Sequence, residues 1–330
     1  MTRAGVPGLE APDPILESEI RSRLEDVEHA LEKAVAADGL LAESAAYLLQ
    51  AGGKRFRPML VLLSGYFGDP ADPRLVPGAV AIELTHLATL YHDDVIDEAE
   101  WRRGIPSVNA RWDNSVAILT GDYLFAKASE ISADLGTEVS RLLSRTIATV
   151  CDGQIREVRS AGSLSQNEND YMATITRKTA SLIATSCRLG GMLSETAPEH
   201  IDLLDRFGEA LGLGFQLSDD VMDVIATEQE LGKEPGTDLR EGVYTLPVIY
   251  ALAKSRELWD LLGDGAPESE RHARALSIIA SEESLSRARE AVTREIRRAK
   301  SLVEAFPEGS ARTALVQLAD YIALRCGAEL

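Results

Sequence analysis

The chain has 330 residues, of which 45% are apolar and 26% are charged. This composition supports a sizeable folded core and argues against a largely disordered protein. The 34 basic and 53 acidic residues give a formal net charge of −19, which excludes a general affinity for nucleic acid or anionic membrane surfaces. The charge of an anionic ligand must therefore be neutralised locally, by clustered basic residues or by metal ions.

The first residues contain several prolines, and we expect residues 1–14 to form a flexible leader ahead of a single domain over residues 15–330. No uninterrupted apolar run reaches the ~18 residues that a transmembrane helix needs. The three cysteines, Cys151, Cys187 and Cys326, have no CxxC or metal-ligand spacing. We therefore expect reduced thiols and a cytoplasmic protein.

Apolar residues recur at helical spacing along almost the whole chain. The apolar run within residues 57–67 continues such a pattern, and residues 82–90 and 203–215 repeat it. No proline lies between Pro106 and Pro198, which leaves room for several long helices. Because strand-like alternation is scarce, the sequence predicts an all-α fold, a large helical bundle.

An Asp-Asp-x-x-Asp motif occupies residues 93–97. On a helix, Asp93, Asp94 and Asp97 project from one side, where their like charges repel one another. An isolated group of this kind is also typical of a solvated helix face. One motif of this kind therefore does not by itself indicate a bound ligand.

The same motif recurs at residues 219–223, where Asp219, Asp220 and Asp223 form a polar stripe with Gln216 on an otherwise apolar helix. Carboxylates on apolar helices need a compensating charge, because burying them unpaired is costly. Oxygen-only ligands favour a hard cation. Mg2+ fits better than Ca2+, because it takes one or two carboxylates and completes its shell with water and phosphate oxygens.

Basic residues stand out against the acidic background at Gly52–Pro58, GGKRFRP, at the start of a predicted helix. Helix-terminal amides and arginine side chains suit a phosphate group, although a solvated basic turn remains the alternative. A P-loop is excluded because its spacing is absent. Further candidates follow the aspartate motifs or lie between them: Arg102, Arg103, Lys178 with Thr179 within a predicted helix, and Lys233 and Asp238 in a predicted loop.

Together these motifs resemble those of the trans-isoprenyl diphosphate synthases, the polyprenyl synthetase family. The resemblance covers about residues 41–247, and HLATLYHDDVIDEA and REGVYTLP are similar to actinobacterial long-chain members that supply menaquinone side chains. It implies a helical bundle around a central active-site cavity, and a homodimer. The matching stretches are GGKRFRP at 52–58, DDVIDEAEWRRG at 93–104, GQ at 153–154, KTA at 178–180, FQLSDDVMD at 215–223 and GKEPGTD at 232–238.

The resemblance also implies roles for individual residues and Mg2+ as cofactor, about three ions bound together with the substrate. The expected metal ligands are Asp93, Asp97 and Asp219, with Asp94, Asp220 and Asp223 as additional or supporting acids. The expected catalytic residues are Asp93, Asp94, Asp97, Arg102, Lys178, Asp219 and Lys233. Arg102, Lys178, Thr179, Gln216 and Lys233 are expected to bind the allylic diphosphate. Gly53, Lys54, Arg57, His86 and Arg103 are expected to bind isopentenyl diphosphate, and Gln154 is a weaker candidate.

The implied reaction joins an allylic diphosphate, farnesyl or geranylgeranyl diphosphate, to isopentenyl diphosphate, and repeats. Metal ions and cationic side chains neutralise the leaving diphosphate, so that an allylic cation forms. The isopentenyl double bond attacks this cation, and the departing pyrophosphate takes the final proton. A dry, apolar pocket keeps water from the cation.

Product length is expected to depend on the residues upstream of Asp93, namely Thr85, Ala88 and Thr89. In family members with short products, a bulky side chain four or five positions before the first aspartate blocks the tunnel. Since none of these three residues is aromatic, we predict a long product, about the size of a respiratory quinone tail. The floor of the tunnel is expected at Leu142, Leu143 or Ile147.

Several alternatives stay open or are disfavoured. The chain could be a short-chain synthase that makes geranylgeranyl or farnesyl diphosphate, or a non-catalytic subunit of a heteromeric prenyl synthase. A class I terpene cyclase or a squalene-type synthase is disfavoured by the second intact aspartate motif and the basic segment at residues 52–58. A purely structural acidic bundle explains neither that segment nor Lys178.

Overall fold

The computed structural model describes residues 13–227, 235–263 and 269–330. The predicted all-α fold is confirmed, because among these residues the only strands are the short β1 (Trp101–Arg102) and β2 (Ile105–Pro106). The chain divides into two compact units. Unit 1 comprises Met1–Ile147, Leu182–Arg206 and Val303–Gln317, and unit 2 comprises Ala148–Ser181, Phe207–Leu302 and Leu318–Leu330.

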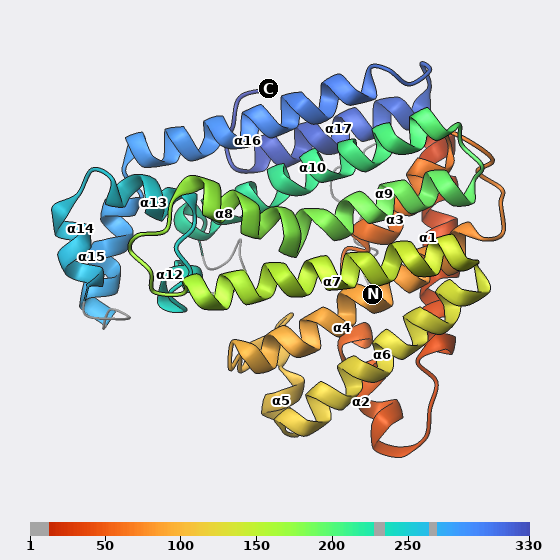
Figure 1. Ribbon diagram of the computed structural model, residues 1–330, viewed down its shortest axis with the longest axis horizontal. Coiled ribbons are helices and arrows are strands. Elements are labelled where there is room, and N and C mark those ends of the chain that lie inside the picture. Colours follow the sequence, from red (N-terminus) through yellow and green to blue (C-terminus); the bar gives the residue numbers. More distant parts are fainter. Residues whose placement is uncertain (1–12, 228–234, 264–268) are drawn as a thin grey trace. The chain divides into compact units, whose positions relative to one another are not determined.

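Most of the helices (Figure 1) belong to one unit, while α7, α10, α16, α17 and, by its first residue, α9 contain residues of both. The helices of unit 1 are α1 (Pro14–Ala34), α2 (Gly39–Gln50), α3 (Phe56–Gly65), α4 (Leu75–Ile96), α5 (Val108–Arg111) and α6 (Asn114–Asp134), together with nearly all of α9 (Ser181–Leu193). Besides α9, whose first residue belongs to unit 2, the helices that contain residues of both units are α7 (Thr137–Ser160), α10 (Pro198–Ile225), α16 (Glu282–Val303) and α17 (Ser310–Arg325). The helix expected within residues 57–67 is thus confirmed as α3, and the proline-free interval holds several long helices, as predicted.

Helix α4 is the central helix of unit 1 and is apolar on almost every side. It contacts α1, α3 and α6, and its buried residues include Val80, Ile82, Leu84, Leu87 and Tyr91. A helix that is apolar all round belongs in a core, and each large side chain buried there stabilises the fold by roughly 1.5–3 kcal/mol. The first aspartate motif therefore lies at the end of one of the most firmly held helices of the unit.

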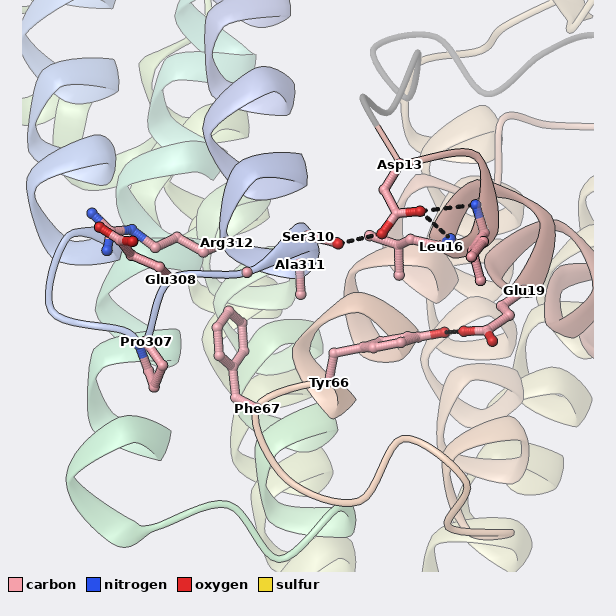
Figure 2. Close-up of a pocket in the computed structure, with 12 residues that line it drawn as sticks. Asp13, Leu16, Glu19, Tyr66, Phe67, Pro307, Glu308, Ser310, Ala311 and Arg312 are labelled. Carbon is pink, nitrogen blue, oxygen red and sulfur yellow. Dashed lines mark hydrogen bonds between the residues drawn. The ribbon is translucent and has the colours of Figure 1, made fainter.

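The start of α1 is fixed by the side chain of Asp13. This carboxylate accepts hydrogen bonds from the backbone N–H groups of Ile15 and Leu16, at 2.9 and 3.4 Å, and from the hydroxyl of Ser310. Figure 2 shows these bonds beside a hollow of about 310 Å³. The residues singled out from the sequence do not line this hollow, and four of its polar side chains are hydrogen-bonded in two pairs, Asp13 with Ser310 and Glu19 with Tyr66.

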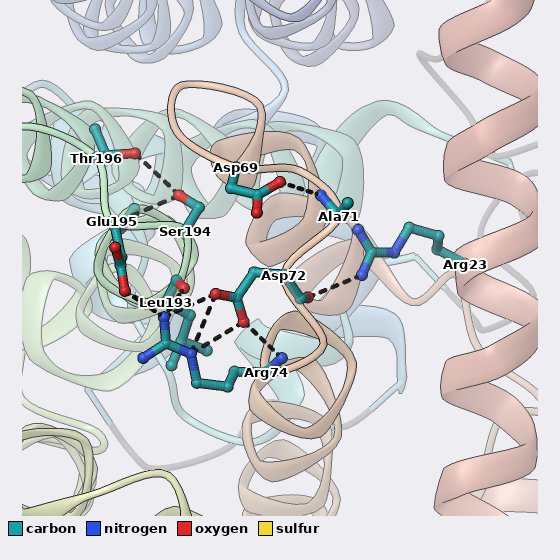
Figure 3. A network of polar contacts seen from close by, with 10 residues as sticks. Arg23, Asp69, Ala71, Asp72, Arg74, Leu193, Ser194, Glu195 and Thr196 are labelled. Carbon is teal, nitrogen blue, oxygen red and sulfur yellow. Dashed lines mark hydrogen bonds and ion pairs between the residues drawn. The ribbon is translucent and has the colours of Figure 1, made fainter.

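A polar network fastens the proline-containing loop before α4 to its neighbours (Figure 3). Arg74 pairs with Asp72 at 2.7 Å and with Glu195 at 3.1 Å, and it donates to the carbonyl of Leu193 at 2.9 Å. Arg23 of α1 donates to the carbonyl of Asp72 at 3.2 Å. Because these groups are partly exposed, each ion pair contributes at most about 1 kcal/mol. The network sets the position of the loop, and α4 begins directly after it.

Unit 2 contains its own apolar cluster. Its helices are α8 (Glu168–Ile175), the π-helical turn η1 (Thr176–Ala180), α12 (Thr237–Arg240), α13 (Leu246–Leu252), α14 (Arg256–Leu262) and α15 (Ser269–Ile279), together with most of α16. The cluster is formed by Leu239, Tyr244, Val248, Ala251, Leu252, Leu258, Leu262, Ala275 and Ile279. The second aspartate motif lies in this unit, near the end of α10.

Three expectations concern the chain as a whole: the lack of a membrane-spanning helix, the leader and the single domain. None of the helices described is both long and apolar enough to cross a membrane. The expected leader, residues 1–14, lies outside the described residues except for Asp13 and Pro14, which begin α1. The expectation of a single domain over residues 15–330 stays a prediction.

Candidate functional site

The first aspartate motif lies in the last turn of α4, and Asp97 is the residue that caps the helix. Asp94 is completely buried, Asp93 is half-buried and Asp97 is exposed. No basic residue occupies this last turn. The C-terminal end of a helix carries partial negative charge, so acidic side chains are unfavourable there unless a cation is bound nearby.

The buried member of this motif is held by an arginine. Asp94 forms an ion pair with Arg102, in which Nε lies 2.6 Å from Oδ1. Arg102 reaches it because β1 and β2 form a hairpin whose two turn residues, Arg103 and Gly104, both have positive φ angles, of 54° and 76°. Burial raises the pKa of Asp94 and Arg102 opposes that rise. Arg102 is therefore held against the motif by this ion pair.

The carboxylates of the second aspartate motif also differ in how exposed they are. Asp219 is 45% exposed, whereas Asp220 and Asp223 are 1% and 4% exposed. Asp220 accepts hydrogen bonds from the Tyr171 hydroxyl and, at 3.0 Å, from Gln216. Burial, followed by the charge of nearby carboxylates, raises the pKa of Asp220 well above its ordinary value.

Asp223 is hydrogen-bonded to the backbone at the start of α12. Its Oδ2 atom accepts from the backbone N–H of Asp238 at 3.3 Å, and its carbonyl accepts from the N–H of Gly236 at 2.8 Å. These bonds position the start of α12. In each motif the first aspartate is thus partly exposed and the second is buried.

The carboxylates that face solvent suit a hard cation. In the part of the chain that the structure describes, no three side chains of His, Cys, Asp and Glu converge to enclose a metal ion. Mg2+ does not require such a cage, because it keeps several waters and is usually held by one or two carboxylates together with phosphate oxygens. Asp93 and Asp97 in unit 1, and Asp219 in unit 2, are thus each carboxylates of the kind that such a cation uses.

The three basic side chains of residues 52–58 differ in exposure: Arg55 is buried, Arg57 is half-buried and Lys54 is exposed. Arg55 precedes the first residue of α3, with a left-handed φ of 45°, and is 6% exposed. It donates to Glu28 at 3.0 Å and to buried Glu83 at 3.1 Å. These two acids were not identified from the sequence, although Glu83 interrupts an apolar helix and so indicates a buried basic partner.

The remaining residues expected to bind isopentenyl diphosphate are gathered in unit 1. Lys54 is exposed and Arg57 half-buried near the start of α3. Arg103 donates to the carbonyl of Leu48 at 2.9 Å and to that of Gly52. A side chain at Gly53 would place its Cβ 3.2 Å from the Arg103 guanidinium and 2.6 Å from that of Arg55. The glycine therefore makes room for the basic groups.

His86 lies on α4, close to this group of cations. Burial lowers its pKa well below the ordinary value, and the positive charges of Arg57, Arg103 and Arg102 lower it further. The imidazole is consequently neutral at neutral pH, whereas the arginines keep their charge. The structure thus brings His86, Arg57 and Arg103 into one positively charged environment that favours an anion.

Lys178 and Thr179 lie in the π-helical turn η1, which connects α8 directly to α9, so the predicted helix is present and contains a π turn. π turns inside helices are frequent at functional sites. Lys178 forms an ion pair with Glu157 of α7, a partner that the sequence analysis missed. Thr179 donates to Gln216 at 2.8 Å, which continues the hydrogen-bonded chain to Asp220 and Tyr171.

The short GQ motif at residues 153–154 lies against this turn. A Cβ atom on Gly153 would lie 2.4 Å from the backbone nitrogen of Lys178, so only glycine allows α7 to pass so close. Gln154 is 9% exposed, and neither polar atom of its amide has a hydrogen-bond partner among the described residues. Leaving such a group unpaired costs about 1–3 kcal/mol, which favours a role in binding. Lys233 lies outside the described residues.

The residues expected to control product length differ in exposure. Thr85 and Ala88 are 0% exposed, and the Thr85 hydroxyl donates to the carbonyl of Ala81 at 2.8 Å. Thr89 is half-buried and donates to the carbonyl of His86 at 2.7 Å. Of the three, Thr89 alone has a surface that a ligand can contact without rearrangement. On α7, Leu143 is buried and Leu142 and Ile147 are half-buried.

Comparison with known proteins agrees with the family expected from the motifs. A profile of the polyprenyl synthetase family matches residues 38–282. The chain is 39% identical to a nonaprenyl diphosphate synthase of Mycobacterium tuberculosis over 98% of both chains. It is 42% identical to heptaprenyl diphosphate synthase component 2 of Geobacillus stearothermophilus, over 91% of this chain and 94% of the relative.

A solved structure supports the same conclusion. Geranylgeranyl pyrophosphate synthase of Corynebacterium glutamicum, complexed with calcium and isoprenyl diphosphate, superposes with a TM-score of 0.84 and 38% identity, over 97% of this chain and 100% of the other. The expectation drawn from the sequence motifs is therefore confirmed, and the chain belongs to the polyprenyl synthetase family.

Proposed function

We propose that the chain is a prenyltransferase that condenses an allylic diphosphate with isopentenyl diphosphate and repeats this step to build an all-trans polyprenyl diphosphate. The family and the names of its relatives support this reaction. Both substrates carry several negative charges, and the protein that must bind them has a net charge of −19. The reaction therefore requires local positive charge from side chains and bound cations.

The observation that carries the proposal is the placement of charge at helix ends. The two acidic motifs lie near the C-terminal ends of α4 and α10, and neither helix has a basic residue in its last turn. Lys54, Arg55 and Arg57 lie at the N-terminal end of α3, which has no acid in its first turn. Each arrangement opposes the helix dipole. Arg102 and Arg325 offset part of the negative charge at the first two places, and Glu28 and Glu83 offset part of the positive charge at the third. A bound cation and a bound anion would complete this compensation.

Mg2+ is the cation that we propose, held by Asp93, Asp97 and Asp219, and when bound it neutralises charge on the leaving diphosphate. The relative complexed with calcium and isoprenyl diphosphate supports a divalent ion at such a site. Asp94, Asp220 and Asp223 are proposed to support these ligands through Arg102, Tyr171 and α12.

The side chains of the two units are proposed to perform different tasks. Lys178, Thr179 and Gln216, together with Arg102 and Lys233, bind the allylic diphosphate. In unit 1, Lys54, Arg57 and Arg103 bind the diphosphate of isopentenyl diphosphate, and neutral His86 can donate one further hydrogen bond. These contacts hold the reacting carbons close together and restrict their freedom, which accelerates the reaction.

Bond changes in the proposed step balance without a redox partner. The allylic carbon–oxygen bond breaks and its electron pair leaves with the diphosphate. The isopentenyl double bond then forms the new carbon–carbon bond, and a proton passes to the released pyrophosphate. Positive charge placed where the negative charge develops lowers the barrier, and the contribution of one such contact is about 10²–10³ in rate.

A long product is proposed. The nonaprenyl and heptaprenyl synthases among the relatives support this length, whereas the geranylgeranyl synthase supports the short-chain alternative. The small Thr89 side chain, four positions before Asp93, favours the long product. Farnesyl or geranylgeranyl diphosphate is the proposed primer, and a menaquinone side chain remains a proposed use.

The assembly is proposed to be a homodimer. Helix α6 exposes Ile118 and Leu119, at 43% and 65%, which supports a partner surface there. The relative named heptaprenyl diphosphate synthase component 2 supports a heteromeric assembly as the alternative. A cytoplasmic location stays a prediction.

One assay tests the reaction, primer and product together. Purified protein is incubated with Mg2+, labelled isopentenyl diphosphate and one of three allylic primers, and the dephosphorylated products are separated by length. Magnesium-dependent incorporation into long products supports the proposal. A lack of incorporation with every primer, in protein that is folded, would overturn it for the chain acting alone.

A further inference from the structure

Arg325, at the end of α17, makes an ion pair with the exposed carboxylate of the second aspartate motif. Its Nη2 atom lies 2.5 Å from Oδ1 of Asp219. The same guanidinium donates to the Ser218 hydroxyl at 2.9 Å and to the carbonyl of Phe215 at 3.1 Å. It also lies 4.7 Å from the centre of the Phe215 ring. Both residues of the pair belong to unit 2.

This contact is built into the unit and is more than a chance surface pair. The Arg325 side chain is only 17% exposed, and four interactions hold its planar group in one orientation. The Ser218 hydroxyl, which accepts from Arg325, donates in turn to the carbonyl of Ile322 at 3.0 Å. One turn of α10 and one turn of α17 are thereby joined by a continuous set of hydrogen bonds.

The residues that follow Arg325 are fastened to α16. Arg289 donates to the carbonyl of Cys326 at 2.8 Å, and Thr293 donates to that of Glu329 at 2.9 Å. The chain turns at Gly327, whose φ is 72°, and the Cys326 side chain is completely buried. Since the segment is anchored on both sides of this turn, Arg325 has little freedom to leave Asp219.

The pair explains how the second motif tolerates its position at a helix end. Asp220 and Asp223 are buried and held by other groups, so Asp219 is the carboxylate of this motif most accessible to a ligand. A guanidinium at 2.5 Å supplies the positive charge that this end of α10 requires. It also occupies an oxygen that a metal ion would use and repels an approaching cation.

We propose that Arg325 is a resident counter-ion that competes with divalent metal for Asp219, so that metal binds tightly only together with a diphosphate. This inference rests on the proposed role of Asp219. The diphosphate supplies the negative charge needed to draw the metal to Asp219 against the repulsion of the guanidinium, which stays in place beside the carboxylate. Metal binding by the free enzyme is weakened in consequence.

The test measures binding of Mn2+ alone to the full-length protein, from the electron paramagnetic resonance signal of the free ion. Arg325→Gln should tighten Mn2+ binding by about tenfold, because one positive charge next to the site is removed. Arg325→Lys keeps the positive charge but loses the planar set of guanidinium N–H donors. Its Mn2+ affinity should lie between those of the wild type and Arg325→Gln. Inorganic pyrophosphate should improve Mn2+ affinity strongly in the wild type and much less in Arg325→Gln.

Arg312→Gln is the matched control, because it makes the same charge change on the same helix. Arg312 donates to the carbonyl of Phe306 and lies 13 residues before Arg325, about 20 Å along the helix. This distance exceeds the Debye length, so its effect on Mn2+ binding should stay within about twofold. Circular dichroism and urea unfolding check that each variant is folded.

Asp219→Asn separates the two proposals. If it weakens Mn2+ binding and cancels the gain from Arg325→Gln in the double variant, both proposals are supported. If Asp219→Asn weakens binding but Arg325→Gln leaves it unchanged or weaker, the counter-ion role is wrong and the metal role of Asp219 stands. Unchanged binding in every Asp219→Asn background would overturn both.

Discussion

The substitution Gly153→Ala tests whether the close passage of α7 positions the π-helical turn. The new methyl group would lie 2.4 Å from the nitrogen and 2.8 Å from the Cα atom of Lys178, and 2.9 Å from the carbonyl carbon of Arg177. All three are backbone atoms, so a side-chain rotation cannot relieve the overlap. Reaching an ordinary contact distance requires η1 to move by about 1 Å.

Two opposing energies set the expected size of the effect. Alanine is favoured over glycine within a helix by about 1 kcal/mol, whereas overpacking in a well-packed region costs about 1–3 kcal/mol. We expect a net loss of stability between about zero and 2 kcal/mol. The activity should fall more, because a shift of about 1 Å in a binding group can cost about 10²-fold in rate.

The assay combines urea unfolding with initial rates at varied allylic diphosphate. Gly309→Ala is the control, since no atom lies within 4 Å of the position its methyl group would take, and both its stability and its rate should stay close to those of the wild type. A Gly153→Ala protein as stable and as active as the wild type would refute the reasoning.

Four further substitutions test other parts of the account. The pKa of His86 is lower in the folded protein than in the unfolded chain. As the pH falls below about 6.5, the unfolded chain therefore takes up a proton first, and the free energy of unfolding declines by at most about 1.4 kcal/mol per pH unit. His86→Gln should make this decline less steep in urea unfolding at varied pH, and an unchanged slope would contradict the assignment. Gln154→Leu removes the unpaired amide and should leave stability unchanged or raise it by about 1 kcal/mol, while the initial rate falls; a wild-type rate would argue against a binding role. Thr89→Phe should shorten the products separated by chromatography, and an unaltered chain length would exclude this position as a determinant. Glu83→Gln breaks a buried pair with Arg55 and should cost about 3–5 kcal/mol in urea unfolding; a loss below 1 kcal/mol would show that the pair contributes little.

The helical fold could be predicted because its signal is local. Apolar spacing identified α3 and α4, and the absence of proline from Pro106 to Pro198 indicated long helices. The π turn at Thr176–Ala180 was not predicted, because apolar spacing does not distinguish a single π turn within a helix, and its close approach to Gly153 is a contact between distant segments. The division into two compact units also depends on contacts between distant segments and has no local signature.

The candidate site was predicted in part. Motif spacing identified the carboxylates and basic residues, but it did not distinguish exposed Asp219 from buried Asp220. Partners from distant segments were also missed, among them Glu157 for Lys178 and Arg325 for Asp219. Such pairs are formed by tertiary packing, and a single sequence carries only indirect signs of them, such as a lone charged residue on an apolar helix.

Both aspartate motifs are proposed to serve one magnesium-dependent prenyl transfer. The most direct measurement is the initial rate of label transfer from isopentenyl diphosphate to farnesyl diphosphate for the wild type, Asp93→Asn, Asp219→Asn and the double variant. Each single substitution should lower the rate by about 10²-fold or more while the protein stays folded, and a chelator should stop the wild type. A double variant that keeps the wild-type rate, or a wild type that is indifferent to the chelator, would contradict the claim.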